Sequence, residues 1–341
     1  MTRVSDLSED ALLALIVPHL PVSDDAIVPT GDDCAVLAAS DGRVAVSTDM
    51  LVEGRHFLRT WSTGADVGWR AAMQNLADAV AMGARPTSLV VSMALPGDLD
   101  AGWIEDFARG IAEACRSAGA GVDGGDLVGG DSIVISVTVM GVLDGRKPRL
   151  RSSALASEPL IHAGVLGHGA AGIALLERGY TREAGTLPGF EGLLIDDFLR
   201  PKPPLAAALE ACRTGAIGAF MDVSDGLVRD ARRIAAASHV WIDIESTRLA
   251  YDIEKLTAVA RRLGMSDPWQ WAFDSVLTGG EDHGFLGTLR VSEHKAWGLD
   301  TPSLPEGFRR IGTVRAGCEG GRVTVDGREI GALGGWDHFA R

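Results

Sequence analysis

Strand-like and helix-like segments alternate along the first half of the chain, and this alternation restricts the fold more than any other feature of the sequence. Runs of β-branched and apolar residues at 44–51, 88–95 and 133–140 are typical of strands. Residues 66–82 and 101–117, which lie between these runs, have the pattern of helices. The sequence therefore predicts a mixed α/β (α+β) protein, although the pattern alone does not fix the order of the strands.

The chain has 341 residues, which predicts about two domains. The segment 143–151 contains Gly145, Pro148 and five charged residues, a composition that favours a linker. We therefore expect an N-terminal domain at residues 1–148 and a C-terminal domain at residues 149–341.

The charge and the cysteines argue against several classes of protein. The 46 acidic and 32 basic residues leave a formal net charge of −14, and such a field repels nucleic acid. The most apolar window, 160–176, is broken by two histidines and four glycines and is shorter than the roughly 20 residues of a membrane span. The four cysteines are far apart without a Cys-x-x-Cys pair, which suggests neither a zinc cluster nor a disulfide framework. We expect a cytoplasmic protein without nucleic-acid or membrane partners.

Six aspartates adjoin glycine, a hydroxyl residue or an apolar strand instead of a charged run. They are Asp33, Asp49, Asp78, Asp126, Asp222 and Asp225. Taken singly, most can be explained as caps and turn formers. Taken together, hard oxygen ligands without neighbouring His or Cys match the preference of Mg²⁺ for carboxylates, waters and substrate phosphates. The pattern therefore indicates a magnesium nucleotide as ligand.

Asp78 is the clearest of these aspartates. The segment 76–82 offers it almost no polar neighbour, and Asp is a poor residue for the middle of a helix. A buried carboxylate without a partner is costly or takes up a proton, so we expect a cation to meet it. Asn75 lies on the same helical face and can add a second oxygen ligand.

The common phosphate-binding motifs are absent or incomplete. No Gly-x-x-x-x-Gly-Lys-Ser/Thr is present, which argues against a P-loop enzyme. A Gly-x-Gly-x-x-Gly at 167–172 follows a strand-like run, as in a dinucleotide fold, but residues 185–191 read as a Gly/Pro loop where that fold needs a strand ending in an acid. The segment is therefore more typical of a tight strand-to-helix turn. Residues 119–126 predict a second glycine-rich loop, which either approaches phosphates or is a surface turn. His56 and His283, taken singly, are more typical of structural histidines.

Taken in order, these segments resemble the thiamine-monophosphate kinases, members of the ATP-binding superfamily that includes aminoimidazole ribonucleotide synthetase. Any one motif is modest, but their order and spacing together are specific and cover nearly the whole chain. The segments are 31–35 (Gly-Asp-Asp-Cys-Ala), 47–49 (Ser-Thr-Asp), 54–57 (Gly-Arg-His-Phe), 75–78 (Asn-Leu-Ala-Asp), 124–126 (Gly-Gly-Asp), 150–152 (Leu-Arg-Ser), 200–201 (Arg-Pro), 222–226 (Asp-Val-Ser-Asp-Gly), 279–282 (Gly-Gly-Glu-Asp) and 336–339 (Trp-Asp-His-Phe).

The resemblance implies three groups of site residues. The ligands of several Mg²⁺ ions are Asp33, Ser47, Thr48, Asp49, Asp78, Asp126, Asp222 and Asp225. The residues that contact ATP are Gly125, Asp126, Arg151 and Ser224, with Arg109 near the adenine. The pocket for thiamine monophosphate is lined by His56, Glu281 and Trp336.

The resemblance also implies a reaction and an assembly. The reaction is phosphorylation of thiamine monophosphate by ATP to thiamine diphosphate, through direct in-line transfer without a catalytic acid or base. The assembly is a homodimer whose N-terminal sheets pair into a shared barrel, while a C-terminal α/β lobe closes the site. Two departures stand out: His283-Gly284 replaces a Tyr and an acid, and Trp336 replaces a frequent Tyr. The alternatives are another ATP-dependent synthetase of the superfamily and a nonenzymatic MgATP-binding regulator.

Overall fold

The computed structural model describes residues 2–30, 34–182, 189–290, 303–317 and 319–330. The chain forms two compact units, and it passes from the first to the second between Lys147 and Pro148. Unit 1 comprises residues 1–80, 84–147 and 199–201, whereas unit 2 comprises residues 81–83, 148–198 and 202–341.

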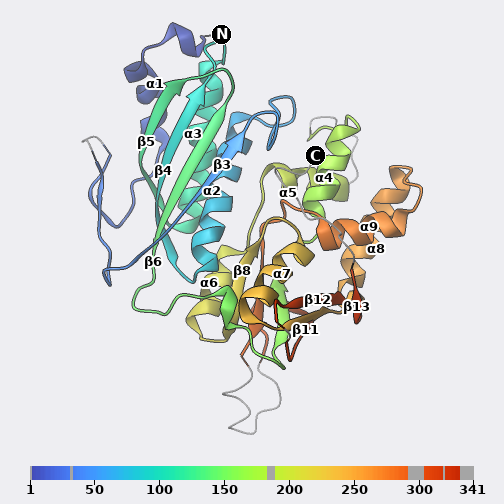
Figure 1. The fold of residues 1–341 in the computed structure, drawn as a ribbon. Helices are drawn as coiled ribbons and strands as arrows, with labels where there is room; N and C mark the ends of the chain where they lie inside the picture. Colours follow the sequence, from blue (N-terminus) through green and yellow to red (C-terminus); the bar gives the residue numbers. More distant parts are fainter. Residues whose placement is uncertain (1, 31–33, 183–188, 291–302, 318, 331–341) are drawn as a thin grey trace. The chain divides into compact units, whose positions relative to one another are not determined.

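Unit 1 is built on a four-stranded sheet with the strand order β3-β6-β4-β5 (Figure 1). The strands are β3 (Val44–Val52), β4 (Arg85–Leu95), β5 (Gly121–Gly129) and β6 (Val134–Val142). Only the pair β4–β5 is parallel, which requires the crossover helix α3 (Ala101–Ala118) between them. α2 (Gly64–Ala81) packs closely against α3, because a Cβ on Gly64 or Gly68 would meet carbonyl oxygens of α3 at 2.1 and 2.2 Å.

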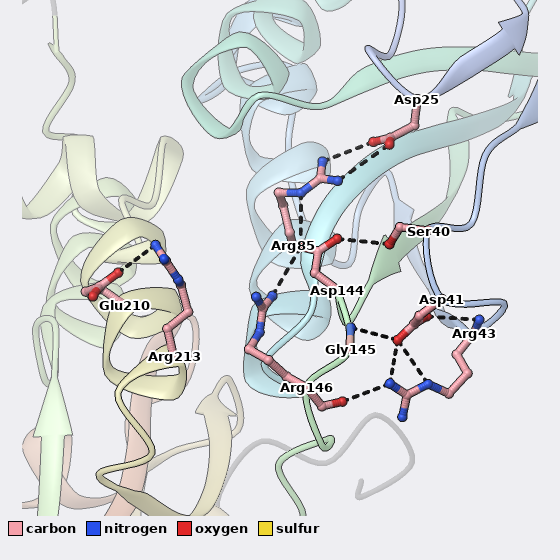
Figure 2. Close-up of polar contacts among 10 residues, drawn as sticks. All are labelled: Asp25, Ser40, Asp41, Arg43, Arg85, Asp144, Gly145, Arg146, Glu210 and Arg213. Carbon is pink, nitrogen blue, oxygen red and sulfur yellow. Dashed lines mark hydrogen bonds and ion pairs between the residues drawn. The ribbon is translucent and has the colours of Figure 1, made fainter.

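The N-terminal segment of unit 1 adds short elements beside this sheet. They are η1 (Val4–Asp6), α1 (Glu9–Ile16), η2 (Val17–His19), β1 (Ala26–Val28) and β2 (Val36–Leu37), of which β1 and β2 pair with each other. A polar network fixes the segment to the ends of β4 and β6 (Figure 2). In it Arg85 donates to Asp25 at 3.0 Å, and Asp144 accepts from Ser40 at 3.1 Å. Each such surface contact stabilises by only about 0–1 kcal/mol, so the attachment depends on the whole network.

Unit 2 contains a seven-stranded sheet with the order β13-β12-β9-β11-β7-β10-β8. Its strands are β7 (Pro159–Ala163), β8 (Ile217–Val223), β9 (Trp241–Ile244), β10 (Gly284–Leu289), β11 (Phe308–Arg315), β12 (Arg322–Val325) and β13 (Arg328–Glu329). Its helices are η3 (Arg151–Ser153), α4 (His168–Glu177), α5 (Gly189–Leu199), α6 (Leu205–Arg213), α7 (Leu227–Ser238), η5 (Ser246–Leu249), α8 (Ala250–Arg262) and α9 (Pro268–Thr278). Phe220 and Phe285 stack at 5.4 Å between ring centroids, within the buried core of the sheet.

The mixed α/β fold and the main elements of the N-terminal half are confirmed. The interpretation of residues 119–126 as a loop is wrong, because β5 begins at Gly121 and pairs with β4. Its glycines are needed for close backbone approach: a Cβ on Gly121 would lie 2.1 Å from the amide nitrogen of Ser23. Residues 185–191 were expected to form a loop, and this is wrong for residues 189–191, which belong to helix α5. Residues 183–188 lie outside the described residues. No helix within the described ranges has the length and apolar character needed to span a membrane.

Candidate functional site

β3 and α2 bring together three of the predicted ligands in unit 1. Ser47 and Asp49 project from one face of β3, because side chains alternate along a strand. Ser47 Oγ donates to Asp78 Oδ2 on α2 at 2.8 Å, and Gln74 Nε2 lies 3.5 Å from Asp49 Oδ2. Asp78 is half-buried, so the expectation of a buried carboxylate without polar company is wrong. A strand distant in sequence supplies the hydroxyl partner.

Asn75 offers a further oxygen on α2, one helical turn before Asp78. The side chain is fully buried, and its Nδ2 donates to Ala71 O at 2.8 Å, one helical turn earlier. Its Oδ1 has no hydrogen-bond partner within the described part of the chain. A buried acceptor left unpaired costs about 1–3 kcal/mol, so this oxygen is suited to a water or a cation. Carboxylate, hydroxyl and amide oxygens on β3 and α2 form a donor set that fits Mg²⁺.

Two other predicted ligands of unit 1 lie on the opposite face of the sheet. Thr48 is exposed, and its hydroxyl donates to Val137 O at 3.0 Å. Asp126 is exposed and stands opposite Ser92 in the β4–β5 register. The side chains of Thr48 and Asp126 are therefore separated by the sheet from Ser47 and Asp49.

A β-bulge at Asp123 sets the direction of Asp126. Asp123 is an extra residue in the β4–β5 register, because Val122 and Gly124 face successive residues of β4. Its buried carboxylate accepts the Ser88 hydroxyl at 2.5 Å and the Ser23 N–H at 3.0 Å. A shift of one residue exchanges the two faces of a strand, so the bulge determines that Asp126 points outward. No local sequence pattern indicates this bulge, since the segment resembles a loop.

A cavity of about 350 Å³ lies between α1, α3, β4 and β5 of unit 1. Its wall includes the segment 124–127 of β5 and apolar side chains of α3, among them Phe107 and Ile111. Arg109 is on the other side of α3, where it donates to Asp106 at 2.5 Å and is ion-paired with Glu105. The structure thus brings Gly125 and the backbone of Asp126 to this cavity, and it directs Arg109 away from it.

His56 occupies the turn that follows β3. Gly54 has a φ of 81°, and its N–H donates to Phe57 O at 2.9 Å to close the turn. The half-buried His56 accepts the N–H of Val52 on Nδ1 at 2.9 Å. That bond places the proton of a neutral ring on Nε2 and fixes the orientation of the imidazole.

In unit 2 the turn from β8 to α7 holds Asp222, Ser224 and Asp225. Asp222 is buried, and the N–H groups of Ser224 and Asp225 both donate to Asp230 at 3.1 Å. Arg233 donates to Asp225 and Asp230, each at 2.5 Å. Burial raises the pKa of Asp230 to about 7, although the charge of Arg233 opposes this shift. Asp230 and Arg233 are structural partners of this turn that the sequence analysis missed.

Arg151 and Ser224 are attached to opposite ends of α7. The carbonyl oxygen of Arg151 accepts the hydroxyl of Ser238, the last residue of the helix, at 2.7 Å. Ser224 precedes the first turn of the same helix. Of the two ATP contacts expected in unit 2, only Ser224 therefore lies with Asp222 and Asp225.

Glu281 lies beside the β8–α7 turn, because its N–H donates to Ser224 O at 2.8 Å. Its carboxylate Oε2 is 3.1 Å from Nε2 of His283. Both residues have left-handed backbones, with φ values of 73° and 51°. Sequence pattern places Glu281 after glycines but gives no indication of this conformation. His283, where relatives carry Tyr by the resemblance, thus contacts a residue expected to bind substrate.

The interpretation of residues 167–172 as a tight strand-to-helix turn is confirmed, and the dinucleotide fold is excluded. β7, which precedes this glycine motif, has antiparallel neighbours on both sides, whereas that fold needs parallel strands. The N–H groups of Gly167 and Gly169 donate to Asp282 at 2.5 and 2.8 Å. An internal carboxylate therefore takes the place that a nucleotide phosphate has in the dinucleotide motif.

The predicted site residues lie in both units. Asp33 and Trp336 fall outside the described residues. Within the described ranges, no three His, Cys, Asp or Glu side chains gather closely enough to hold a metal by themselves. Hydroxyl, amide and substrate oxygens therefore have to complete any Mg²⁺ site formed by these residues.

Comparison with known proteins extends over nearly the whole chain. Residues 31–143 match the family model "AIR synthase related protein, N-terminal domain". The chain is 40% identical to the thiamine-monophosphate kinase of Mycobacterium tuberculosis, over 98% of this chain and 93% of that protein. It is 36% identical to the thiamine-monophosphate kinase of Corynebacterium glutamicum, over 98% and 95% of the two chains.

Solved structures give the same result for the fold. The crystal structure of thiamine monophosphate kinase from Aquifex aeolicus has a TM-score of 0.71 and 30% identity, over 89% of this chain and 92% of that chain. A structure described as AaThiL complexed with AMPPCP and TMP has a TM-score of 0.72 and 30% identity, over 99% of each chain. Hydrogenase maturation protein HypE in complex with ATP, with a TM-score of 0.68 and 20% identity over 98% and 96%, shares the fold alone.

Proposed function

The chain belongs to the thiamine-monophosphate kinase family, and on this premise we propose that it transfers the γ-phosphoryl group of ATP to thiamine monophosphate, giving thiamine diphosphate and ADP. The observation that carries the proposal is 40% identity to a kinase of this name over 98% of the chain. The match extends over nearly the whole chain and therefore includes parts of both units.

The charges of the substrates explain why acids are useful in this site. ATP and thiamine monophosphate are both anions, and two like charges 4 Å apart repel by about 4 kcal/mol at an effective dielectric of 20. Mg²⁺ ions held by the acids, when bound, neutralise and align the phosphates. We assign the Mg²⁺-binding role to the set Asp33, Ser47, Thr48, Asp49, Asp78, Asp126, Asp222 and Asp225. The contacts of Ser47, Asp49 and Asp78 on β3 and α2 support the part of this assignment that concerns these three residues. Thr48 and Asp126 lie on the opposite face of the sheet.

The ATP contacts follow from the cavity in unit 1. The cavity has a volume of about 350 Å³ and a largely apolar lining, which suits a purine base, and Gly125 and Asp126 in its wall are assigned to the phosphates. In unit 2 we assign Ser224 to ATP, and Arg151 is a weaker member because it is attached to the opposite end of α7. Arg109 is the weakest member of this group, because reaching the adenine requires breaking its ion pairs with Glu105 and Asp106.

Thiamine monophosphate is assigned to His56, Glu281 and Trp336. Glu281 offers a carboxylate to the cationic thiamine, and an indole offers an aromatic face for stacking. The acceptor is a phosphate oxygen that is already ionised near neutral pH. Transfer therefore needs alignment of the two phosphates and no side chain acting as a general acid or base.

We further propose a homodimer formed through the sheet of unit 1. β3 is an edge strand, and its exposed face carries Val44, Val46 and Met50, which are 52%, 69% and 53% exposed. An apolar edge of this kind is a liability unless another strand covers it. Sedimentation of the Val46→Asp variant tests the dimer, since a charge in this face should yield monomers. The cytoplasmic location expected from the cysteines stays a prediction.

The direct test is release of ADP by the purified chain. We expect release that depends on both thiamine monophosphate and Mg²⁺, that stops with EDTA, and that yields thiamine diphosphate by chromatography. ADP formation without any effect of thiamine monophosphate favours another synthetase of the superfamily. Binding of MgATP by calorimetry without turnover favours a nonenzymatic regulator, and either result contradicts the kinase.

A further inference from the structure

The loop Gly279-Gly280-Glu281-Asp282-His283 is held in an unfavourable backbone conformation. Glu281 and His283, on either side of Asp282, have φ values of 73° and 51°. Residues other than glycine rarely adopt this region, and its cost is met only where surrounding contacts fix the chain. The contacts that hold this loop therefore determine the position of Glu281, a proposed substrate ligand.

Asp282 supplies two of these contacts. It is 5% exposed, and its Oδ2 and Oδ1 accept the N–H groups of Gly167 and Gly169 at 2.5 and 2.8 Å. These N–H groups belong to the start of α4, whose helix dipole favours a negative charge. One carboxylate thus fastens the loop to the first turn of α4 through both of its oxygens.

The glycines of residues 167–172 fit this contact closely. Gly167 has a φ of 77°, which turns its N–H toward the loop. A Cβ on Gly169 would lie 2.4 Å from the carbonyl oxygen of Gly280 and 3.0 Å from Cβ of Glu281. The motif that resembles a nucleotide-binding fingerprint is therefore shaped to receive the loop that carries Glu281.

The same loop is tied to the β8–α7 turn. The N–H of Glu281 donates to Ser224 O at 2.8 Å, and the side chain of Glu281 is 3.1 Å from His283. Because Asp282 is the next residue in the chain, a displacement of Asp282 strains these contacts of Glu281.

We propose that Asp282 is a positioning residue for substrate recognition: by clamping Gly167 and Gly169, it holds Glu281 in the conformation that binds thiamine monophosphate. The inference rests on the proposed function. It gives the glycine motif of unit 2 a role in acceptor specificity that does not involve a nucleotide. Burial raises the pKa of Asp282 to about 6, and the two N–H bonds oppose this rise, as expected for a carboxylate kept charged by the clamp near neutral pH.

The test compares Asp282→Asn with Asp243→Asn. Asparagine keeps the shape but turns an amide NH₂ toward a backbone N–H, so one bond of the clamp is lost. Asp243 is a matched control, because it is also buried in unit 2 and accepts the N–H of Gly327 at 2.8 Å. We expect Asp282→Asn to raise KM for thiamine monophosphate about tenfold or more, with KM for ATP changed less than about twofold. Asp243→Asn should lower stability without this selective change.

A second variant keeps the test valid if Asp282→Asn folds poorly. Gly169→Ala leaves the carboxylate intact but pushes a methyl group against Gly280, and it should raise the same KM selectively. Amide hydrogen exchange adds a readout without turnover: protection in segment 279–283 should fall in folded Asp282→Asn and not in Asp243→Asn. Equal KM changes in the two Asn variants, or unchanged exchange at 279–283, overturn the inference. If ADP release by the wild type does not depend on thiamine monophosphate, the proposed function is refuted, and the exchange experiment still tests the clamp.

Discussion

Replacing Gly125 with alanine tests whether β5 is held against β4 in the register that forms the proposed ATP site. A Cβ at this position would lie 2.2 Å from the carbonyl oxygen of Val91, which is the residue opposite it on β4. Two such atoms need more than about 3 Å, so the strands must separate by about 1 Å. The clash involves backbone atoms on both strands, and a side-chain rotation cannot relieve it.

The expected loss of stability can be worked from this geometry. Forcing an extra methyl group into a packed site costs about 1–3 kcal/mol. Stretching the backbone bonds on either side of the Val91–Gly125 pair adds about 1 kcal/mol for each bond weakened. We therefore expect the free energy of unfolding to fall by about 3–5 kcal/mol, the sum of these two costs.

Urea unfolding and steady-state kinetics measure the two consequences. Gly129 is the control, since it is also in β5 and a Cβ there would meet nothing within 4 Å. Gly129→Ala should change the free energy of unfolding by less than about 0.5 kcal/mol, as is usual for surface substitutions. Gly125→Ala should also raise KM for ATP, because the shifted strand moves the cavity wall. If the two variants unfold at the same urea concentration, the close approach of β4 and β5 is refuted.

Two further predictions concern charged and titrating groups. Asp78→Ala should abolish ADP release, because Asp78 is a proposed Mg²⁺ ligand. Its urea unfolding midpoint should stay close to that of the control Asp131→Ala, which changes an exposed aspartate of the same unit. Near-normal turnover of Asp78→Ala would remove Asp78 from the metal site. His162 is fully buried, and burial lowers its pKa from 6.5 to about 3, so only the unfolded chain takes up this proton as the pH falls below 6.5. Stability should therefore drop between pH 7 and pH 5 by about 2 kcal/mol more in the wild type than in His162→Leu, measured by urea unfolding, and parallel pH profiles contradict this.

The elements of the N-terminal half were predictable because their apolar patterns are long and local. β3 and α2 show this, since hydrophobic spacing alone places both. β5 was not predictable, because four glycines and two aspartates among nine residues resemble a loop. What makes it a strand is pairing with β4 across the crossover helix α3, a contact that no local pattern records.

The candidate site was predictable in composition more than in arrangement. The six aspartates could be identified as candidate metal ligands because each adjoins glycine, a hydroxyl residue or an apolar strand. Their partners could not, because Ser47 meets Asp78 and Asp282 meets Gly167 only through the tertiary fold. Thr48 and Asp49 point to opposite faces of the sheet, because side chains alternate along a strand. The resemblance did not show this, since it identifies ligands by their position in the sequence and does not say to which face of the sheet they point.

Two glycine-rich segments with similar sequences owe their glycines to different physical causes. In β5, Gly125 is glycine because a neighbouring strand leaves no room for a methyl group. At the start of α4, Gly167 supplies a left-handed turn, and Gly169 lets another loop approach. The first segment lines the cavity of unit 1 to which we assign ATP, whereas the second directs its N–H groups at Asp282. A glycine motif therefore indicates a phosphate site only when its backbone N–H groups remain available, and in this chain that condition excludes the segment whose pattern matches the better-known fingerprint.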